Sequence, residues 1–426
     1  MNRDLLPVHD IAALSGNNAP VRDEIEISDL PVIGQVPADL NGMYVRNGPN
    51  AYYPPKWRYH AYDGDGMVHA VSFDRGKLSY RNRWIQTAEL LEEQHAGQSL
   101  WTGLKEAPRH DTPDRPLKNT SNTDVKYHAG RLITMWYRSG MPYALDPVSL
   151  KTLGTADYDG AFGRISAHSR PDEHTGELLF FDYDVKPPYM QYGVIGPDRK
   201  LKHKVDIPLP GPRLPHDMAV TENYTILHDF PLFGDEIVMV GTPYRMHETD
   251  DGKIDARRLE RTINQRQRDF MLYEWRFNLR TDSTRERIID DVLNSEFPVI
   301  NSAYQGRRNQ FSYNIVFPQG GREEPRFPGL VKYNIDTGSY VAYSEGPQSF
   351  YNEPGFAPRD NCRAEDDGYL ISYVWNDREQ RSEIQIFDAL GPQIGHGPIA
   401  RILMPQRIPN GFHATYVSAK VMQRWQ

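Results

Sequence analysis

Short apolar runs separated by turns dominate the pattern of hydrophobic and polar positions along this chain. A recurring unit consists of an apolar run, a turn with Asp or Gly, and a second apolar run, as in Lys332-Tyr-Asn-Ile-Asp-Thr-Gly-Ser-Tyr-Val. Such a unit is typical of a β-hairpin. It occurs six times, with turns near residues 75, 146, 196, 280, 336 and 388. Long stretches with helical periodicity are scarce, so the pattern predicts an all-β fold.

The spacing of these hairpins predicts a β-propeller. Most steps from one turn to the next are about 50 to 56 residues, close to the roughly 40 to 50 residues of a four-stranded blade. We therefore predict a single β-propeller domain over residues 1–426.

Two steps depart from this spacing. The step of about 71 residues after the first turn contains residues 88–97, whose helical pattern predicts a cap over the sheets. The step of about 84 residues between the third and fourth turns is too long for one blade and too short for two. It includes a charged helical or loop stretch at residues 254–270. We expect one blade to be incomplete in this interval.

Composition narrows the classes of function. A formal net charge of −8 argues against a nucleic-acid-binding protein. The single cysteine, Cys362, excludes an intrachain disulfide and a cysteine-based metal site, which favours a reducing cytoplasm. No signal-peptide pattern and no run of 18 apolar residues is present, so we expect no membrane span, although peripheral membrane contact stays open. The oligomeric state is not indicated.

Three histidines stand among apolar or turn residues next to predicted inner strands: His168, His216 and His413. The inner strands of all blades converge on the axis of a propeller, so these imidazoles can meet although they are far apart in sequence. Imidazole is a common ligand of iron, copper and zinc. The pattern therefore indicates an axial metal site. The alternative, that each histidine only packs or caps a strand, stays open for each residue taken singly.

Ordered motifs along nearly the whole chain resemble signatures of the carotenoid cleavage oxygenases. They are Gly42-Met-Tyr-Val-Arg-Asn-Gly-Pro-Asn, Tyr62-Asp-Gly-Asp-Gly-Met-Val-His, Tyr80-Arg-Asn-Arg-Trp, Asn122-Thr-Asp-Val, His216-Asp-Met-Ala-Val-Thr-Glu-Asn-Tyr, Ser295-Glu-Phe-Pro, Asn352-Glu-Pro-Gly-Phe-Ala-Pro-Arg and Gly411-Phe-His. The resemblance implies a seven-bladed propeller with a helical dome. It also implies an Fe(2+) ion held by four histidines, and oxidative cleavage of an alkene by O2.

The resemblance assigns roles to five residues. His168, His216 and His413 match three of the four iron-ligand motifs. Glu296 and Glu353 match glutamates that accept a hydrogen bond from the second ring nitrogen of a ligand, which fixes the orientation of that ligand. We expect the Nε2 atoms of the three histidines to lie within about 4 Å of one another.

The chain departs from the family at two places. The segment that carries the third histidine ligand is absent, because the strand after His216 runs almost directly through Leu232 into residues 235–241. This is the interval in which the hairpin spacing is anomalous. His228 and His247 are the nearby histidines that could replace that ligand. A third family glutamate is replaced as well, since Tyr137 and its neighbour Arg138 stand in its place.

These observations lead us to expect a cytoplasmic Fe(2+)-dependent dioxygenase that cleaves a conjugated double bond of a carotenoid or apocarotenoid to carbonyl products. A first alternative substrate is a phenolic alkene of the lignostilbene, resveratrol or isoeugenol type. The family's stilbenoid-cleaving members use a lysine and a tyrosine to engage the phenol hydroxyl, and Trp136 stands at the expected position of that lysine. A second alternative is an iron-poor, catalytically impaired propeller that acts as a binding protein. With three histidines, we expect weaker iron binding than in a four-histidine relative.

Overall fold

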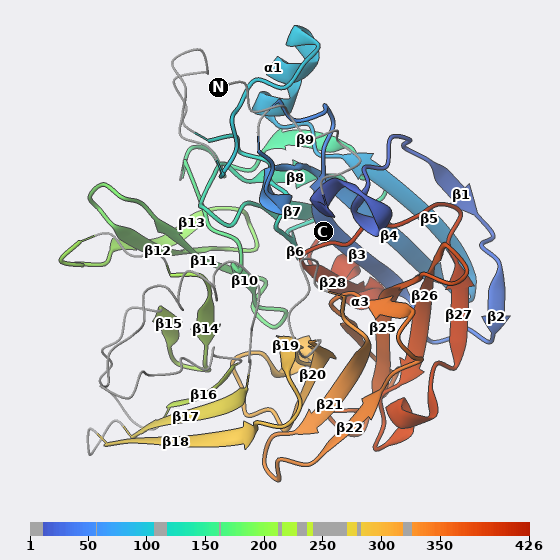
Figure 1. Ribbon diagram of the computed structural model, residues 1–426. Helices are drawn as coiled ribbons and strands as arrows, with labels where there is room; N and C mark the ends of the chain where they lie inside the picture. The colour runs from blue at the N-terminus through green and yellow to red at the C-terminus, as the bar shows by residue number, and fades with distance from the viewer. Residues whose placement is uncertain are drawn as a thin grey trace, which may run out of the picture.

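Antiparallel sheets arranged in a ring around one axis build the computed structural model (Figure 1). The structure describes residues 12–56, 58–105, 117–161, 163–211, 215–227, 237–241, 271–278, 283–317 and 326–426. Within these ranges there are seven sheets, which follow one another around the ring in chain order. The predicted all-β propeller is confirmed.

The first sheet joins the two ends of the chain. Its order is β28-β3-β4-β5-β1, and the register pairs Ala414 with Arg46 and Ser418 with Gly42. The strands are β1 (Glu26–Ser28), β3 (Gly42–Asn50), β4 (Asp65–Asp74), β5 (Lys77–Trp84) and β28 (Ala414–Ser418). Because β28 is the innermost strand and comes from the far end of the sequence, this pairing closes the ring.

Four further sheets have four or more strands each. The second sheet contains β6 (Asp124–His128), β7 (Arg131–Met135), β8 (Tyr143–Leu145) and β9 (Thr152–Thr155). The third contains β10 (Arg170–Pro171), β11 (Leu178–Tyr183), β12 (Met190–Ile195) and β13 (Leu201–Asp206). Another contains β19 (Ser295–Val299), β20 (Phe311–Val316), β21 (Gly329–Asn334) and β22 (Tyr340–Tyr343). The last contains β2 (Val32–Gly34), β23 (Ser349–Tyr351), β24 (Gly355–Pro358), β25 (Gly368–Asn376), β26 (Arg381–Asp388) and β27 (Ala400–Leu403).

The remaining two sheets are short and adjacent. One consists of β14 (Met218–Val220) and β15 (Thr225–Leu227), and the other of β16 (Ile237–Gly241), β17 (Leu272–Asn278) and β18 (Ser283–Asp290). They lie in the interval where an incomplete blade was predicted, so the incomplete propeller is confirmed for the described residues. The shortage of strands is nevertheless shared by two neighbouring sheets instead of falling on one. Among the described residues, one of them retains only β14 and β15, and the other retains β16 and the outer hairpin β17–β18.

The predicted hairpins correspond to the outer strand pairs β4–β5, β8–β9, β12–β13, β17–β18, β21–β22 and β26–β27. The helical cap is confirmed as α1 (Ala88–Ala96), which projects at the top of Figure 1. Thr87 caps its N-terminus by accepting a hydrogen bond from the Leu90 N–H, and Gly97 ends it with φ of 68°. The charged stretch at residues 254–270 lies outside the described residues.

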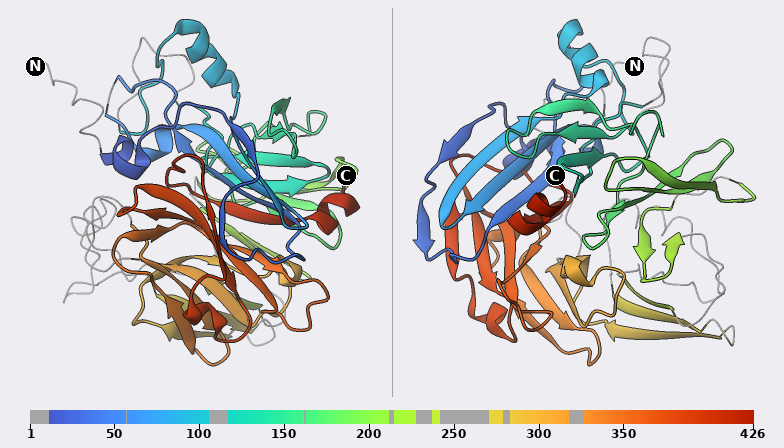
Figure 2. Two further views of the ribbon diagram at one scale, coloured as in Figure 1. Left: turned by 90° about the vertical axis from the view of Figure 1, so that its right-hand side faces the viewer. Right: turned by 180° about the vertical axis from the view of Figure 1, so that it is seen from behind.

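A second helix, α3 (Ala419–Arg424), follows β28 and lies on the back of the ring (Figure 2, right). Short 3₁₀ helices are η2 (Ala12–Leu14), η3 (Gly16–Asn18), η4 (Ala61–Asp63), η5 (Ser302–Tyr304) and η6 (Gln393–His396).

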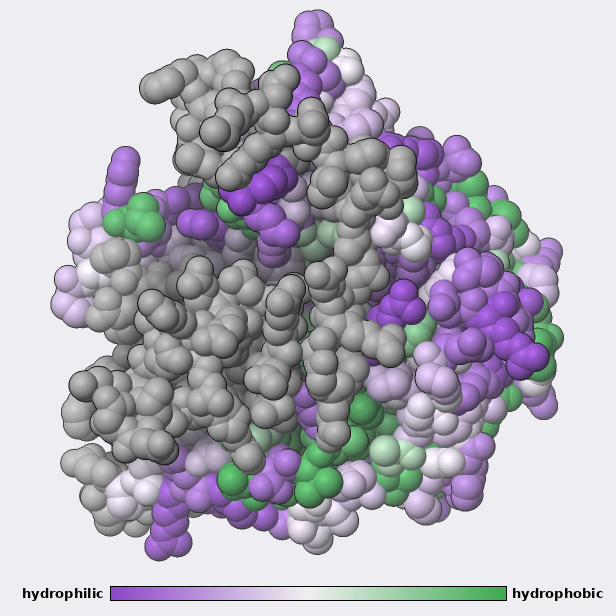
Figure 3. All heavy atoms as spheres, in the orientation of Figure 1, coloured by the Kyte–Doolittle hydropathy of each residue, from purple (hydrophilic) through white to green (hydrophobic). Residues whose placement is uncertain are grey.

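The core lies between neighbouring sheets. Strand β5 alternates exposed or half-buried positions with buried ones, and its buried Tyr80 joins Tyr44 and Tyr373 in one apolar cluster. Ile133 and Phe180 belong to the corresponding cluster between the second and third sheets. The front face is largely hydrophilic among the described residues, with apolar residues gathered near the sheet of β19–β22 (Figure 3). No helix in the described ranges is long and apolar enough to span a membrane.

Candidate metal centre

The three candidate histidines lie at one end of the ring axis. His168 comes shortly before β10, and His216 and His413 come shortly before β14 and β28. Each of these strands is the first in its sheet order, which places their leading ends around the axis. The ring centroid of His168 lies 4.8 Å from that of His216 and 4.5 Å from that of His413. The fold therefore brings together side chains that are distant in sequence.

These separations agree with a shared ion. An imidazole that binds a metal through Nε2 at about 2.1 Å has its ring centroid about 3.2 Å from the ion, and two such rings at right angles have centroids about 4.5 Å apart. No group of three or more His, Cys, Asp or Glu side chains in the described part of the chain has the spacing of a formed metal site. The three imidazoles lie next to one another in the fold, and their nitrogens would have to turn toward one point to hold an ion.

His168 is the most enclosed of the three histidines. It is buried, its φ is 67°, and its backbone N–H donates to Asp124 Oδ2 at 3.0 Å. A positive φ is uncommon in residues other than glycine and costs conformational free energy, which the surrounding contacts must offset. Burial lowers the pKa of His168 to about 3, so the ring is neutral at physiological pH, as a metal ligand must be. Its Nε2 is buried with no hydrogen-bond partner among the described residues.

His413 is oriented by Glu353. The Nδ1 of His413 lies 3.1 Å from Glu353 Oε1, and the Ala414 N–H donates to Glu353 Oε2 at 2.5 Å. Burial opposes a charge on His413, but the Glu353 carboxylate raises the pKa of His413 above its ordinary value. With Nδ1 donating to the carboxylate, Nε2 is left as the nitrogen that can bind a metal.

His216 and Glu296 are less buried than His168. His216 is exposed, and the neighbouring Asp217 accepts from Arg170 Nη2 at 2.8 and 2.9 Å. Glu296 is half-buried on the inner strand β19, next to Phe297, whose ring centroid lies 5.4 Å from that of His413. His228 and His247 lie outside the described residues.

Asp124 is a site residue that the sequence reasoning did not single out. It is the first residue of β6, is fully buried, and bonds the backbone of His168 and the ammonium of Lys126, the latter at 3.0 Å. Burial raises the pKa of Asp124. Lys126 and the two nearby imidazoles lower this pKa by a larger amount, so it is about 2, below its ordinary value. The available signals were its place at the start of the inner strand β6 and its position in the motif Asn122-Thr-Asp-Val.

Aromatic side chains surround the approach to these histidines. The Tyr62 ring lies 4.6 Å from that of Phe412 and 4.9 Å from that of Tyr137. Tyr137 thus fills with an aromatic ring the place where a third glutamate was expected. Together with Phe297, these rings provide an apolar surface suited to an apolar ligand and to the exclusion of water.

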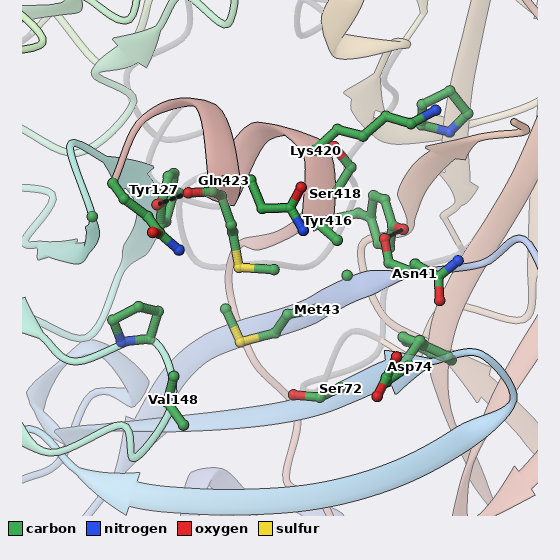
Figure 4. A pocket seen from close by; sticks show the side chains of 18 of the residues that line it. Asn41, Met43, Ser72, Asp74, Tyr127, Val148, Tyr416, Ser418, Lys420 and Gln423 are labelled. Atoms are coloured by element: carbon green, nitrogen blue, oxygen red, sulfur yellow. Dashed lines mark hydrogen bonds between the residues drawn. The ribbon is translucent and has the colours of Figure 1, made fainter. Parts of the chain in front are cut away.

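A cavity of the described residues lies apart from these histidines. It has a volume of about 1530 Å³ and lies around α3, lined by residues that include Met43, Tyr127, Ser418 and Gln423 (Figure 4). Because β28 begins directly after His413 and ends at Ser418, which lines this cavity, the cavity is at the opposite end of that strand from His413. None of the three histidines lines it.

The chain is similar to known proteins over nearly its whole length. It matches the family described as retinal pigment epithelial membrane protein over residues 18–251 and 234–418. It is 29% identical to a carotenoid 9,10(9',10')-cleavage dioxygenase 1 of Phaseolus vulgaris over 503 aligned residues, which cover 96% of this chain and 90% of the relative. Since this chain has 426 residues, the relative contains residues that this chain lacks.

Two solved structures illustrate the likeness of fold. A lignostilbene dioxygenase of Pseudomonas brassicacearum has a TM-score of 0.84 and 25% identity, with 97% of this chain and 100% of that chain covered. A cobalt-substituted apocarotenoid oxygenase of Synechocystis has a TM-score of 0.78 and 23% identity, with 94% and 97% covered.

Proposed function

Because the chain belongs to the retinal pigment epithelial membrane protein family, we propose that it is a dioxygenase that cleaves a conjugated carbon–carbon double bond of a carotenoid or apocarotenoid. The observation that carries this proposal is the gathering of His168, His216 and His413 at one end of the axis, with the buried Nε2 of His168 lacking any other partner among the described residues.

The residues present fit an Fe(2+) ion, and His168, His216 and His413 would hold it. When bound, iron supplies the activation of O2 that spin restriction otherwise makes slow. The reaction needs no organic cosubstrate. The C=C bond and the O–O bond break, two C=O bonds form, and each carbonyl product takes one oxygen atom.

The chain's own groups prepare this reaction. Glu353 holds the tautomer and orientation of His413, and Asp124 holds the backbone of His168. The rings of Tyr62, Phe412 and Phe297 provide an apolar wall beside the histidines. This wall would position an apolar polyene and limit water, which protects reactive oxygen chemistry from side reactions.

Iron affinity is part of the proposal. The missing ligand segment leaves His168, His216 and His413 as the candidate ligands in the described part of the chain, and three protein ligands suffice in other non-haem Fe(2+) oxygenases. We expect binding to be weaker than in a four-histidine relative. The single Cys362 fits a reducing compartment, and on this basis we place the protein in the cytoplasm.

A phenolic alkene is the second candidate substrate. The observation that favours it is the TM-score of 0.84 to the lignostilbene dioxygenase. Trp136 at the expected lysine position argues for an apolar substrate instead. A non-catalytic, iron-poor binding protein is the remaining alternative, and iron content separates it from both enzymes.

The test is to purify the protein anaerobically with Fe(2+), measure bound iron, and assay O2-dependent conversion of an apocarotenal and of resveratrol to aldehydes. We expect iron in the chain as given and its loss in His413→Ala. His203→Ala is the control, because His203 is exposed on the outer strand β13. An iron-free protein that cleaves neither compound would overturn the proposal.

A further inference from the structure

One buried side chain on β3, Asn47, is hydrogen-bonded to the segments that present two of the three histidines. It is fully buried, and β3 packs against both β28 and β6 near the axis of the ring (Figure 1). We propose that Asn47 is a positioning residue that fixes the spacing between the backbones of His168 and His413. The inference rests on the proposed function in taking these two histidines to be metal ligands.

The main chain of Asn47 holds the segment of His413. Its N–H donates to the His413 carbonyl at 3.0 Å, and its carbonyl accepts the Phe412 N–H at 3.1 Å. The regular pairing of β3 with β28 ends at Arg46 and Ala414. The two bonds of Asn47 therefore continue this pairing up to the histidine itself.

The side chain of Asn47 holds the segment that supports His168. Its Nδ2 donates to the Ser121 carbonyl at 2.7 Å and to the Asp124 carbonyl at 3.0 Å. The carboxylate of the same Asp124 accepts the His168 N–H at 3.0 Å. The backbones of His413 and His168 are thus connected by hydrogen bonds through Asn47 and Asp124 alone.

An asparagine has the right chemistry for this place. Both amide N–H groups are used on the two carbonyls, and Oδ1 accepts the Gly48 N–H at 2.9 Å. Ser121 has a φ of 48°, a costly conformation that the bond to its carbonyl helps to hold. An aspartate would place a carboxylate against two carbonyl oxygens. A leucine of similar size would leave both carbonyls without this donor in a buried place.

The first measurement needs no metal. Hydrogen exchange of the metal-free protein is followed at the amides of Phe412, His413 and His168 in the original chain, in Asn47→Leu and in Asn47→Asp. We expect exchange at all three amides to become about tenfold faster in Asn47→Leu, the effect of about one lost hydrogen bond, and faster still in Asn47→Asp. Thermal unfolding checks that each variant is folded, and Asn47→Leu carries the test if Asn47→Asp does not fold.

The second measurement separates positioning from general stabilisation. Co(2+), the ion of the cobalt-substituted relative, is titrated anaerobically and followed by visible absorption. We expect about tenfold weaker binding in Asn47→Leu, the lower end of the usual loss when support behind a ligand is removed. Asn82→Leu is the matched control. Asn82 is also fully buried, but its amide bonds the Asp23 carbonyl at 2.8 Å and the Ile25 N–H at 2.9 Å, before β1.

The control should destabilise the fold while leaving both cobalt affinity and exchange at the two histidines unchanged. Unchanged exchange at His168 or His413 in Asn47→Leu overturns the inference, and so does a loss of cobalt affinity no greater than in Asn82→Leu. Failure of the proposed function gives a different result. An original chain that binds no cobalt and cleaves no alkene contradicts that function, whereas faster exchange at both histidines in Asn47→Leu still supports the role of Asn47 in their spacing.

Discussion

Replacing Glu353 with glutamine tests the link between the polar network and iron binding. One carboxylate now accepts from both His413 Nδ1, at 3.1 Å, and the Ala414 N–H, at 2.5 Å. An amide has a single oxygen, so Glu353→Gln must place its NH2 group against one of these two donors. The substitution also removes the negative charge that raises the pKa of His413. Both changes weaken the hold on the His413 ring.

The expected loss is about 10- to 100-fold in iron affinity, the usual effect of removing a partner behind a metal ligand. This corresponds to about 1.4 to 2.7 kcal/mol, in line with one hydrogen bond to a charged group. The assay is an anaerobic Fe(2+) titration against a competing chelator, followed by turnover at saturating iron. Glu379→Gln is the control, because it alters a surface ion pair with Arg381. Unchanged iron affinity and turnover in Glu353→Gln would refute the role of this carboxylate.

Three further predictions concern stability and the shortened interval. Asp124 has a folded-state pKa of about 2, below its ordinary 3.8, so it contributes about 2 kcal/mol of stability above pH 4 that is lost as the pH falls toward 2. Urea unfolding across this pH range should show the loss, and Asp124→Asn should make the free energy of unfolding less dependent on pH. Phe180→Ala should lower the free energy of unfolding by about 3 to 5 kcal/mol, because the ring is fully buried between two sheets; a loss below 1 kcal/mol in urea unfolding would contradict that packing. Inserting a family-like histidine segment after Leu232 should raise iron occupancy and alkene cleavage, whereas full occupancy without it would show that three histidines already suffice.

Local patterns predicted much of the fold. The six hairpins and the helix at Ala88–Ala96 depend on residues close together in sequence, and all were found. The division of the missing strands between two sheets was not predictable, because hairpin spacing gives the length of an interval and not which strands it lacks. The sequence singled out His168, His216 and His413 as candidates because each comes shortly before an inner strand, and the structure places each of them there.

Two features of the candidate site needed the packed structure. Asp124 is the first residue of β6, and its contacts with His168 and Lys126 show what its carboxylate does there. A cavity beside Trp136 depends on segments that are separate in sequence, residues 58–65, 99–104 and 117–120, meeting around it, and no local sequence pattern predicts this. The ligand roles of the three histidines stay predictions until iron is measured.

The pairing of β28 with β3 has a consequence for the order of events during synthesis. Arg46 on β3 donates to the carbonyl of Pro409, which is 363 residues later in the chain. At about 5 to 20 residues per second, a ribosome needs about 20 to 70 s to cover those 363 residues. For that time β3 has an unpaired edge that can pair with strands of other chains. Such pairing leads to aggregation unless a chaperone covers the edge. His413 arrives directly before the strand that ends this exposure, so the three histidines can come together only in a chain whose ring has closed.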